Sequence, residues 1–230
     1  MSDRRVRVLR EAVVATAREM NALGINRGKS GNVSARWRDA SFDGYLITPS
    51  GMPYAETTPE DIVPMPLESD VARGVDAEAF GARRLPSSEW RFHRDIYAAR
   101  DDASAIVHTH APFATALACL RRGIPAFHYM VAIAGGKDIR CAPYATFGTQ
   151  ALSDHAVAAL EGRKACLLAN HGVIAIGASL TNALALAVEV ETLAEMYWRA
   201  LQVGDPVLLD DAEMAVVLEK FRTYGQKLDV

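Results

Sequence analysis

The chain has 230 residues, half of them hydrophobic and 23% charged, with a formal net charge of −3 at pH 7. This length is enough for one large hydrophobic core, so we expect a single domain spanning residues 1–230. The slightly acidic balance excludes the strongly basic surface typical of nucleic-acid-binding proteins. It also gives no reason to expect an anionic membrane surface as a partner.

The cysteines and the N-terminal segment indicate a cytoplasmic protein. The three cysteines form no Cys-x-x-Cys pair, lie among apolar neighbours, and are predicted to be buried, reduced thiols: Cys119, Cys141 and Cys166. The N-terminal arginines are followed by a helical pattern rather than an apolar core, so we expect no targeting segment. The apolar stretch over residues 180–198 is interrupted by an asparagine and three glutamates, which predicts a helix outside the membrane.

The spacing of apolar residues predicts helices and short strands along the whole chain. Helices are expected over residues 4–23, from Ser87 or Ser88 as N-cap, from Pro112 to about Arg122, and over 149–161, 180–202 and 211–221. Extended segments are expected over residues 33–37, 45–48, 61–64 (at a sheet edge), 105–110, 124–130, 141–147, around 167, and 173–176. Together they predict an α/β fold with a central mixed, mostly antiparallel sheet covered by helices on both faces.

Two histidines end the predicted strand over residues 105–110. His108 and His110 are two residues apart, so on a strand their side chains point to one face, and imidazole is a common ligand of Zn²⁺. His171, in a turn between two apolar runs, would complete a set of three ligands with an open coordination position, which is the catalytic arrangement. The alternative interpretation is that these are ordinary polar residues at a strand end. Two other folds that use a His-x-His pair do not fit. A cupin site would need a glutamate four or five residues after the second histidine, and residues 112–116 contain none. An amidohydrolase barrel would carry the pair near the start of a longer chain.

Two polar turns offer groups for a small anion. Residues 26–32 contain a Gly-Lys-Ser sequence, but the glycine spacing and the helix-before-strand order exclude a nucleotide-binding P-loop. This segment is therefore either an anion-binding turn rich in backbone N–H groups or a plain tight turn. Ser87 and Ser88, at a helix start, also suit a phosphate or carboxylate. Glu89 follows them, where it either takes part in chemistry or only compensates the helix dipole.

Five segments in this order resemble the class II aldolase family, which includes L-fuculose-1-phosphate aldolases and enzymes like the L-ribulose-5-phosphate epimerases. They are residues 31–34 (Gly-Asn-Val-Ser), 46–51 (Leu-Ile-Thr-Pro-Ser-Gly), 86–93 (Pro-Ser-Ser-Glu-Trp-Arg-Phe-His), 108–110 (His-Thr-His) and 171–172 (His-Gly). Residues 124–130, 141–148, 215–221 and 223–225 resemble the fuculose-phosphate aldolase branch. The resemblance implies the class II aldolase/adducin-type fold. It also implies a Zn²⁺ site at His108, His110 and His171, with Mn²⁺ or Co²⁺ as other suitable metals.

The same resemblance implies roles for further residues. Glu89 is implied as the acid/base carboxylate, which also touches the metal when no substrate is bound. The substrate phosphate is expected against three pairs of residues: Gly31 and Asn32, Ser50 and Gly51, and Ser87 and Ser88. Tyr129 is implied as a proton-transfer group reaching the neighbouring subunit of a homotetramer with shared active sites, although it also fits a core tyrosine. Tyr224 is implied as a second catalytic tyrosine on a mobile C-terminal tail (about residues 222–230). Lys29, where the fuculose enzymes carry a small hydroxyl residue, and a longer excursion over residues 68–85 depart from the family pattern.

The implied function is that of a metal-dependent aldolase that reversibly cleaves a ketose 1-phosphate to dihydroxyacetone phosphate and an aldehyde. The expected substrate is L-fuculose 1-phosphate or a related 5-deoxypentulose 1-phosphate, such as 5-deoxyribulose or 5-methylthioribulose 1-phosphate. A sugar-phosphate 4-epimerase or a decarboxylase using the same metal chemistry stays open as an alternative. A non-catalytic scaffold like the adducin head also stays open, although such a scaffold is expected to lack the metal ligands.

Overall fold

The computed structural model describes residues 2–40, 42–68 and 83–223. Its elements in chain order are α1 (Ser2–Ala22), β1 (Asn32–Arg38), β2 (Asp43–Ile47), η1 (Pro59–Asp61), β3 (Val63–Pro66), α2 (Trp90–Ala99), β4 (Ala105–Thr109), α3 (Pro112–Cys119), η3 (Tyr129–Ala134), β5 (Arg140–Ala142), α4 (Gln150–Ala159), β6 (Ala165–Leu168), β7 (Gly172–Gly177), α5 (Leu180–Val203) and α6 (Asp211–Thr223). Here η marks a short 3₁₀ helix. Tyr224, nearly all of the predicted tail, and most of the 68–85 excursion lie outside the described residues.

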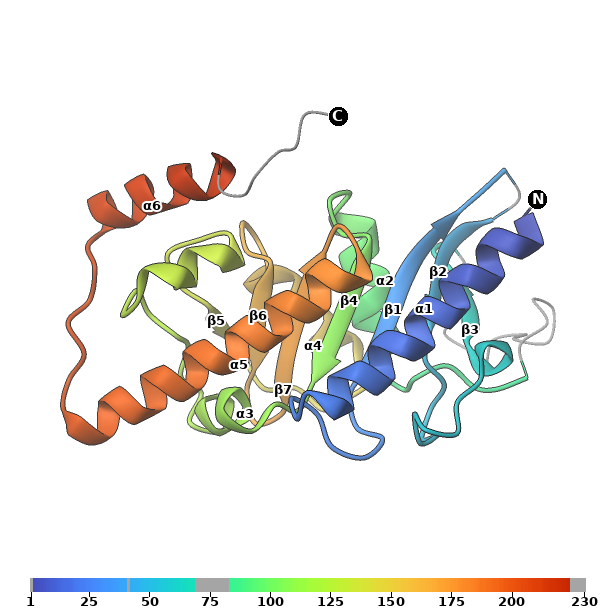
Figure 1. Ribbon diagram of the computed structural model, residues 1–230, viewed down its shortest axis with the longest axis horizontal. Helices are drawn as coiled ribbons and strands as arrows, with labels where there is room; N and C mark the ends of the chain where they lie inside the picture. Colours follow the sequence, from blue (N-terminus) through green and yellow to red (C-terminus); the bar gives the residue numbers. More distant parts are fainter. Residues whose placement is uncertain (1, 41, 69–82, 224–230) are drawn as a thin grey trace.

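The strands form one seven-stranded sheet in the order β3-β2-β1-β4-β7-β6-β5 (Figure 1). Every neighbouring pair is antiparallel except β5 and β6, which run parallel. The prediction of a mixed, mostly antiparallel sheet is therefore confirmed. β4 lies at the centre of the order, so the predicted His-x-His segment ends the middle strand of the molecule.

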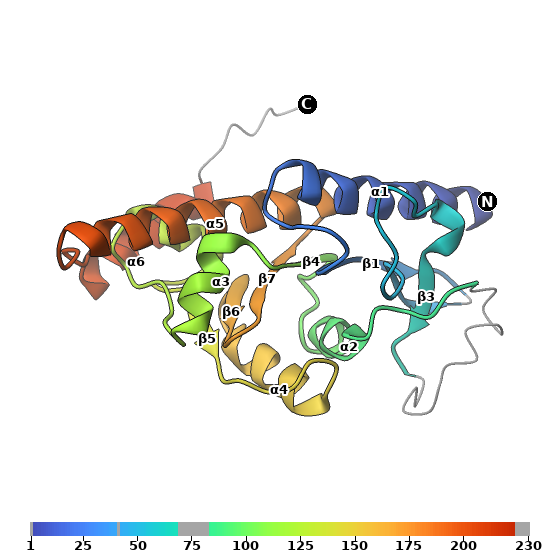
Figure 2. The same ribbon diagram turned by 90° about the horizontal axis from the view of Figure 1, so that it is seen from below.

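Helices cover both faces of this sheet, as predicted. Figure 2 shows α1 and α5 on one side and α2 and α4 on the other. Alternate residues of β4 feed the two cores: Ala105 and Val107 pack with α1, α3 and α5, whereas Ile106 packs with α2 and α4. Because both faces of the sheet are covered, the first three residues of β4 are all apolar instead of alternating between apolar and polar. His108 is two residues after Ile106, so its side chain points to the same face of the sheet, the face covered by α2.

Some local predictions were wrong. Ser87 and Ser88 do not cap α2, since Glu89 is the N-cap residue and makes no side-chain capping bond. The segment over residues 124–130 is not extended throughout, because a 3₁₀ turn begins at Tyr129, where the His128 ring accepts the N–H of Met130. The segment predicted to be extended over residues 141–147 is a strand only at Cys141 and Ala142, where β5 ends. The other predicted elements differ mainly at their ends.

The predictions of an edge strand over residues 61–64 and of three buried cysteines are each confirmed only in part. The short edge strand exists, but it begins two residues later than expected because Pro59–Asp61 forms η1 instead. Of the three cysteines, which are all free, only Cys166 is buried, and Cys119 is exposed at the end of α3. Within the described part of the chain, no helix is long and apolar enough to cross a membrane.

Candidate active site

Three imidazoles meet at one end of the central strands. His108 is the fourth residue of β4, His110 follows the strand, and His171 lies in the turn between β6 and β7. Their ring centroids are 4.8 to 5.1 Å apart, and one nitrogen from each lies within 4.8 Å of the others. His108 and His110 therefore point toward the same place, as predicted, and His171 lies beside both.

This convergence depends on a glycine. A side chain at Gly172 would collide with the carbonyl oxygen of Thr109 and would stand 3.0 Å from the His110 ring and 3.2 Å from the His108 ring. The β6–β7 turn approaches β4 closely only because no Cβ fills this space. Asn170 completes the turn in the left-handed conformation, with φ of 55°, and this places His171 over the other two rings.

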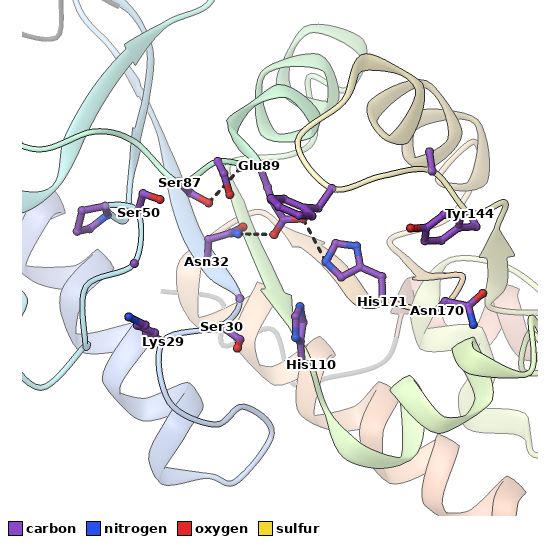
Figure 3. A pocket seen from close by; sticks show the side chains of 16 residues that line it. Lys29, Ser30, Asn32, Ser50, Ser87, Glu89, His110, Tyr144, Asn170 and His171 are labelled. Carbon is purple, nitrogen blue, oxygen red and sulfur yellow. Dashed lines mark hydrogen bonds and ion pairs between the residues drawn. The ribbon is translucent and has the colours of Figure 1, made fainter. Parts of the chain in front are cut away.

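Glu89 closes the histidine cluster from the start of α2 (Figure 3). Its Oε2 lies 3.2 Å from His108 Nε2, and its Oε1 lies 3.1 Å from His171 Nε2. Burial raises the pKa of the Glu89 carboxyl, but the imidazoles of His108 and His171 outweigh burial and hold that pKa well below its usual range. The group is therefore an anionic carboxylate, 6% exposed.

The cluster leaves buried polar atoms without hydrogen-bond partners. These atoms are Glu89 Oε1, His108 Nε2 and His110 Nε2. Glu89 lies 3.1–3.2 Å from two of the imidazole nitrogens, and one nitrogen of each of the three rings lies within 4.8 Å of the others, so these atoms surround one small space. His108 Nδ1 lies 2.8 Å from the carbonyl oxygen of Val173 and must donate to it, so Nε2 is the ring nitrogen left to bind a cation. Buried, unpaired acceptors around one point fit a bound cation, because leaving them unpaired is costly.

His110 is also suited to bind a cation. Burial, and next the neighbouring His108, lower the pKa of the His110 ring to about 4, so the ring is neutral at pH 7 and keeps a lone pair. Its backbone N–H is held by Asn26 Oδ1 at 3.2 Å. Asn26 is 1% exposed and also donates to the carbonyl oxygen of Ser30, at 2.7 Å. It thereby holds the 26–32 turn against the histidine cluster, a role that the sequence did not reveal.

A cavity of about 310 Å³ opens in front of Glu89, His110 and His171. It is lined by all three predicted phosphate-binding pairs together with Lys29 and Ser30. Two hydrogen bonds hold two of these pairs side by side: Ser50 N–H to the carbonyl oxygen of Leu85, and Ser87 N–H to that of Thr48, both 3.0 Å. The N–H groups of Gly51 and Ser88 have no backbone acceptor among the described residues. Free amides beside an ammonium group suit an anion.

Two of the side chains predicted to bind phosphate make hydrogen bonds to Glu89 instead. The Asn32 amide is already engaged, since its Nδ2 donates to Glu89 Oε2 at 3.0 Å. The Ser87 hydroxyl accepts the N–H of Glu89 at 3.3 Å and thereby holds the backbone that carries the carboxylate. The further residues that line the cavity without having been singled out individually include Tyr144, Phe147 and Asn170. The sequence signal for the two aromatic residues was the segment 141–148, which resembles the fuculose-phosphate branch but suggested no role for them.

Tyr129 is not brought to this cavity within one chain. It lies on η3, is 51% exposed, and lines a separate cavity of about 600 Å³ beside α6. Its ring centroid is 6.5 Å from that of Phe221. An exposed tyrosine on a helical turn is not the core residue that the sequence left open.

Fold and cavity together define a class of protein: a helix-covered mixed sheet whose central strand ends in a three-histidine cluster that could hold a metal ion, beside a cavity lined by backbone amides and a lysine. The chain belongs to the Class II Aldolase and Adducin N-terminal domain family, whose model matches residues 11–198. The resemblance seen in the five sequence segments is thus confirmed.

Curated relatives and solved structures agree with this family. A 5-methylthioribulose-1-phosphate/5-deoxyribulose-1-phosphate aldolase of Rhodospirillum rubrum is 57% identical over 217 residues, which is 94% of this chain and 92% of the relative. An L-fuculose phosphate aldolase of Escherichia coli K12 is 50% identical over 222 residues, 96% of this chain and 97% of the relative. A solved L-fuculose 1-phosphate aldolase superposes with a TM-score of 0.84 at 42% identity, covering 93% of this chain and 96% of its own.

Proposed function

We propose that this protein is a metal-dependent aldolase that reversibly cleaves a ketose 1-phosphate to dihydroxyacetone phosphate and an aldehyde. The observation that carries the proposal is a single cavity with the three-histidine cluster and Glu89 at one end and the phosphate-binding pairs at the other. Relatives named as ketose-1-phosphate aldolases, similar over nearly their whole length, support the same reaction.

His108, His110 and His171 would hold the metal, joined by Glu89 when no substrate is bound. Three imidazole nitrogens with an open position suit Zn²⁺, and Mn²⁺ and Co²⁺ are the alternatives. When bound, the metal supplies Lewis-acid polarisation of the substrate oxygens next to the bond that breaks.

The chain's own residues move the protons. In cleavage, the C4 hydroxyl gives up its proton as the C3–C4 bond breaks and C4 becomes the aldehyde carbon. The electron pair left on C3 is delocalised toward the C2 carbonyl, and Glu89, which must be in its protonated form for this step, delivers its proton to C3 and is left as the carboxylate. In condensation, the Glu89 carboxylate removes the C3 proton.

Tyr129 is proposed to exchange the proton of the C4 hydroxyl in a neighbouring subunit of a homotetramer. Support comes from its exposure and from its position outside its own chain's cavity. Tyr224 is proposed to act from the C-terminal tail, on the strength of the family resemblance alone. The three free thiols support a cytoplasmic location.

The phosphate end is proposed to orient the substrate. Gly31, Ser50, Gly51 and Ser88 would hold the phosphate away from the reacting carbons, so that binding energy fixes the geometry of C3 and C4. The aldehyde end faces the exposed aromatic rings of Tyr144 and Phe147 at the cavity wall. An apolar wall suits the methyl or methylthio end of a 5-deoxypentulose 1-phosphate and the methyl end of L-fuculose 1-phosphate.

A substrate panel tests the proposal. Metal-loaded protein is assayed against L-fuculose 1-phosphate, 5-deoxyribulose 1-phosphate and 5-methylthioribulose 1-phosphate, with dihydroxyacetone phosphate as the readout. Release of triose phosphate from at least one of them is expected. Interconversion of isomers without triose phosphate would indicate an epimerase, and CO₂ release from a sugar acid would indicate a decarboxylase. Either result would overturn the proposal.

A further inference from the structure

Behind the cavity, β1 and α2 are joined by a ladder of buried polar side chains: Asn32, Ser34, His93 and Tyr97, ending at Glu89. Asn32 and Ser34 are two residues apart on β1, and Glu89, His93 and Tyr97 follow at intervals of four from the start of α2. Each set therefore shares one face of its element, and the two sets interdigitate. The five residues are between 0 and 6% exposed.

The ladder is continuous in hydrogen bonds. Asn32 Nδ2 lies 3.0 Å from Glu89 Oε2, and Asn32 Oδ1 lies 2.5 Å from His93 Nε2. His93 Nδ1 lies 2.7 Å from Ser34 Oγ, which in turn lies 2.8 Å from the Tyr97 hydroxyl. Figure 3 shows its cavity end, where the Asn32 amide points at the carboxylate. His93, Ser34 and Tyr97 do not line the cavity.

Only one arrangement of protons satisfies all of these contacts when the histidine is neutral. A carboxylate only accepts, so Asn32 donates to Glu89 and its carbonyl oxygen must accept from His93 Nε2–H. Burial lowers the pKa of His93 to about 3, so the ring is neutral and its Nδ1 must accept from the Ser34 hydroxyl. The Ser34 oxygen then accepts from Tyr97. All donors point along the ladder toward Glu89.

We infer that His93, Ser34 and Tyr97 are positioning residues that hold the Asn32 amide with its N–H toward Glu89 and so keep the carboxylate aimed at the reacting carbon. The inference rests on the proposed role of Glu89 as the proton-transfer group. An Asn32 amide turned the other way would place its carbonyl oxygen against the carboxylate, two acceptors in contact without a proton. His93 prevents this rotation because its Nε2–H requires an acceptor.

The first test needs no turnover. In full-length, metal-loaded protein containing ¹⁵N-labelled histidine, NMR reports which nitrogen of each ring carries the proton. His93 is expected to be neutral with the proton on Nε2 at pH 7, and Ser34→Ala is expected to mix in the other tautomer. A proton on Nδ1 alone would leave Nε2 as an acceptor facing Asn32 Oδ1, and protons on both nitrogens would make Ser34 an acceptor and cut Ser34 and Tyr97 off from the donor chain; either result in the unsubstituted protein would overturn the inference.

The second test uses two matched substitutions of buried tyrosines. Tyr97→Phe removes the hydroxyl that begins the ladder. Tyr45→Phe removes a similarly buried hydroxyl that donates to the backbone carbonyl of Trp90 at 2.9 Å and to no ladder residue, and it keeps the ring that packs against His93 and Tyr97. Tyr97→Phe is expected to lower kcat more than Tyr45→Phe at similar stability. Ser34→Ala, which removes the direct partner of His93, is expected to lower kcat about 10- to 100-fold, the usual loss for such a supporting partner. KM and metal content are expected to stay close to those of the parent protein.

The two tests separate this inference from the proposed function. If no ketose phosphate is cleaved, the proposed function fails, and the histidine tautomer still reports whether the ladder is ordered as inferred. If the parent protein is an active aldolase but Ser34→Ala keeps its kcat within about twofold, the ladder is only structural. Equal losses of kcat in Tyr45→Phe and Tyr97→Phe would likewise mean that the ladder does not position Glu89.

Discussion

Replacing Glu89 by glutamine separates its proposed chemical role from its structural one. Glutamine keeps the shape and the oxygen that accepts from Asn32 at 3.0 Å, so the cost in stability is at most about one hydrogen bond, 0.5–1.5 kcal/mol. It cannot accept or deliver the C3 proton, and a proton-transfer group is worth about 10²–10⁴ in rate, or roughly 3–5 kcal/mol in the barrier. The kinetic loss should therefore exceed the loss in stability by about a factor of two or more.

The assay for this variant is the exchange of the C3 proton of dihydroxyacetone phosphate in deuterated water, which isolates one proton transfer. Exchange is expected to fall about 10²–10⁴-fold while the folded structure and the bound metal are retained. Glu195→Gln, at a partly exposed carboxylate paired with Arg199 away from the cavity, is the matched control and should exchange normally. Exchange at the parent rate by Glu89→Gln would show that Glu89 is only a carboxylate at a helix start.

Two further predictions concern Lys29 and the subunit interface. Lys29→Ala is expected to raise KM for the phosphorylated ketose about 3- to 10-fold, because it removes a partly solvated charge contact with the phosphate. Lys29→Arg keeps the charge and should raise KM less. Added salt should bring the KM values of Lys29→Ala and the parent protein closer together, because it screens this contact. Complete loss of turnover would instead indicate a Schiff-base lysine. Glu89→Gln and Tyr129→Phe are each expected to be nearly inactive alone, and refolding equal amounts together should restore about a quarter of the sites if neighbouring chains share them around a ring. Inactive mixtures shown to contain hybrids would remove Tyr129 from the neighbouring site.

The histidine cluster was predictable because its geometry follows from local periodicity and turns. The strand places His108 and His110 on one face, and the apolar runs around His171 predict the turn that carries it. The contribution of Gly172 was not predictable, since the collision that it avoids is with β4, which is far away in the sequence. Asn26 was missed for the same reason, because its side-chain oxygen holds a backbone group just beyond the end of β4.

Local patterns failed where a tertiary partner decides the outcome. Ser87 resembles an N-cap, but its hydroxyl accepts the N–H of Glu89, and the helix begins one residue after that carboxylate. Cys119 has apolar neighbours in sequence, yet the end of α3 leaves it exposed. The location of Tyr129 on an exposed 3₁₀ turn likewise depends on contacts between η3 and α6 that the sequence pattern does not encode.

Metal stoichiometry measured together with turnover tests the central claim most directly. Chelated protein is titrated with Zn²⁺ while bound metal and the release of dihydroxyacetone phosphate are followed on the same samples. Activity is expected to be absent without metal and to rise linearly to a plateau at about one ion per chain, with His110→Ala showing neither tight binding nor turnover. Full aldol cleavage by metal-free protein would contradict the account.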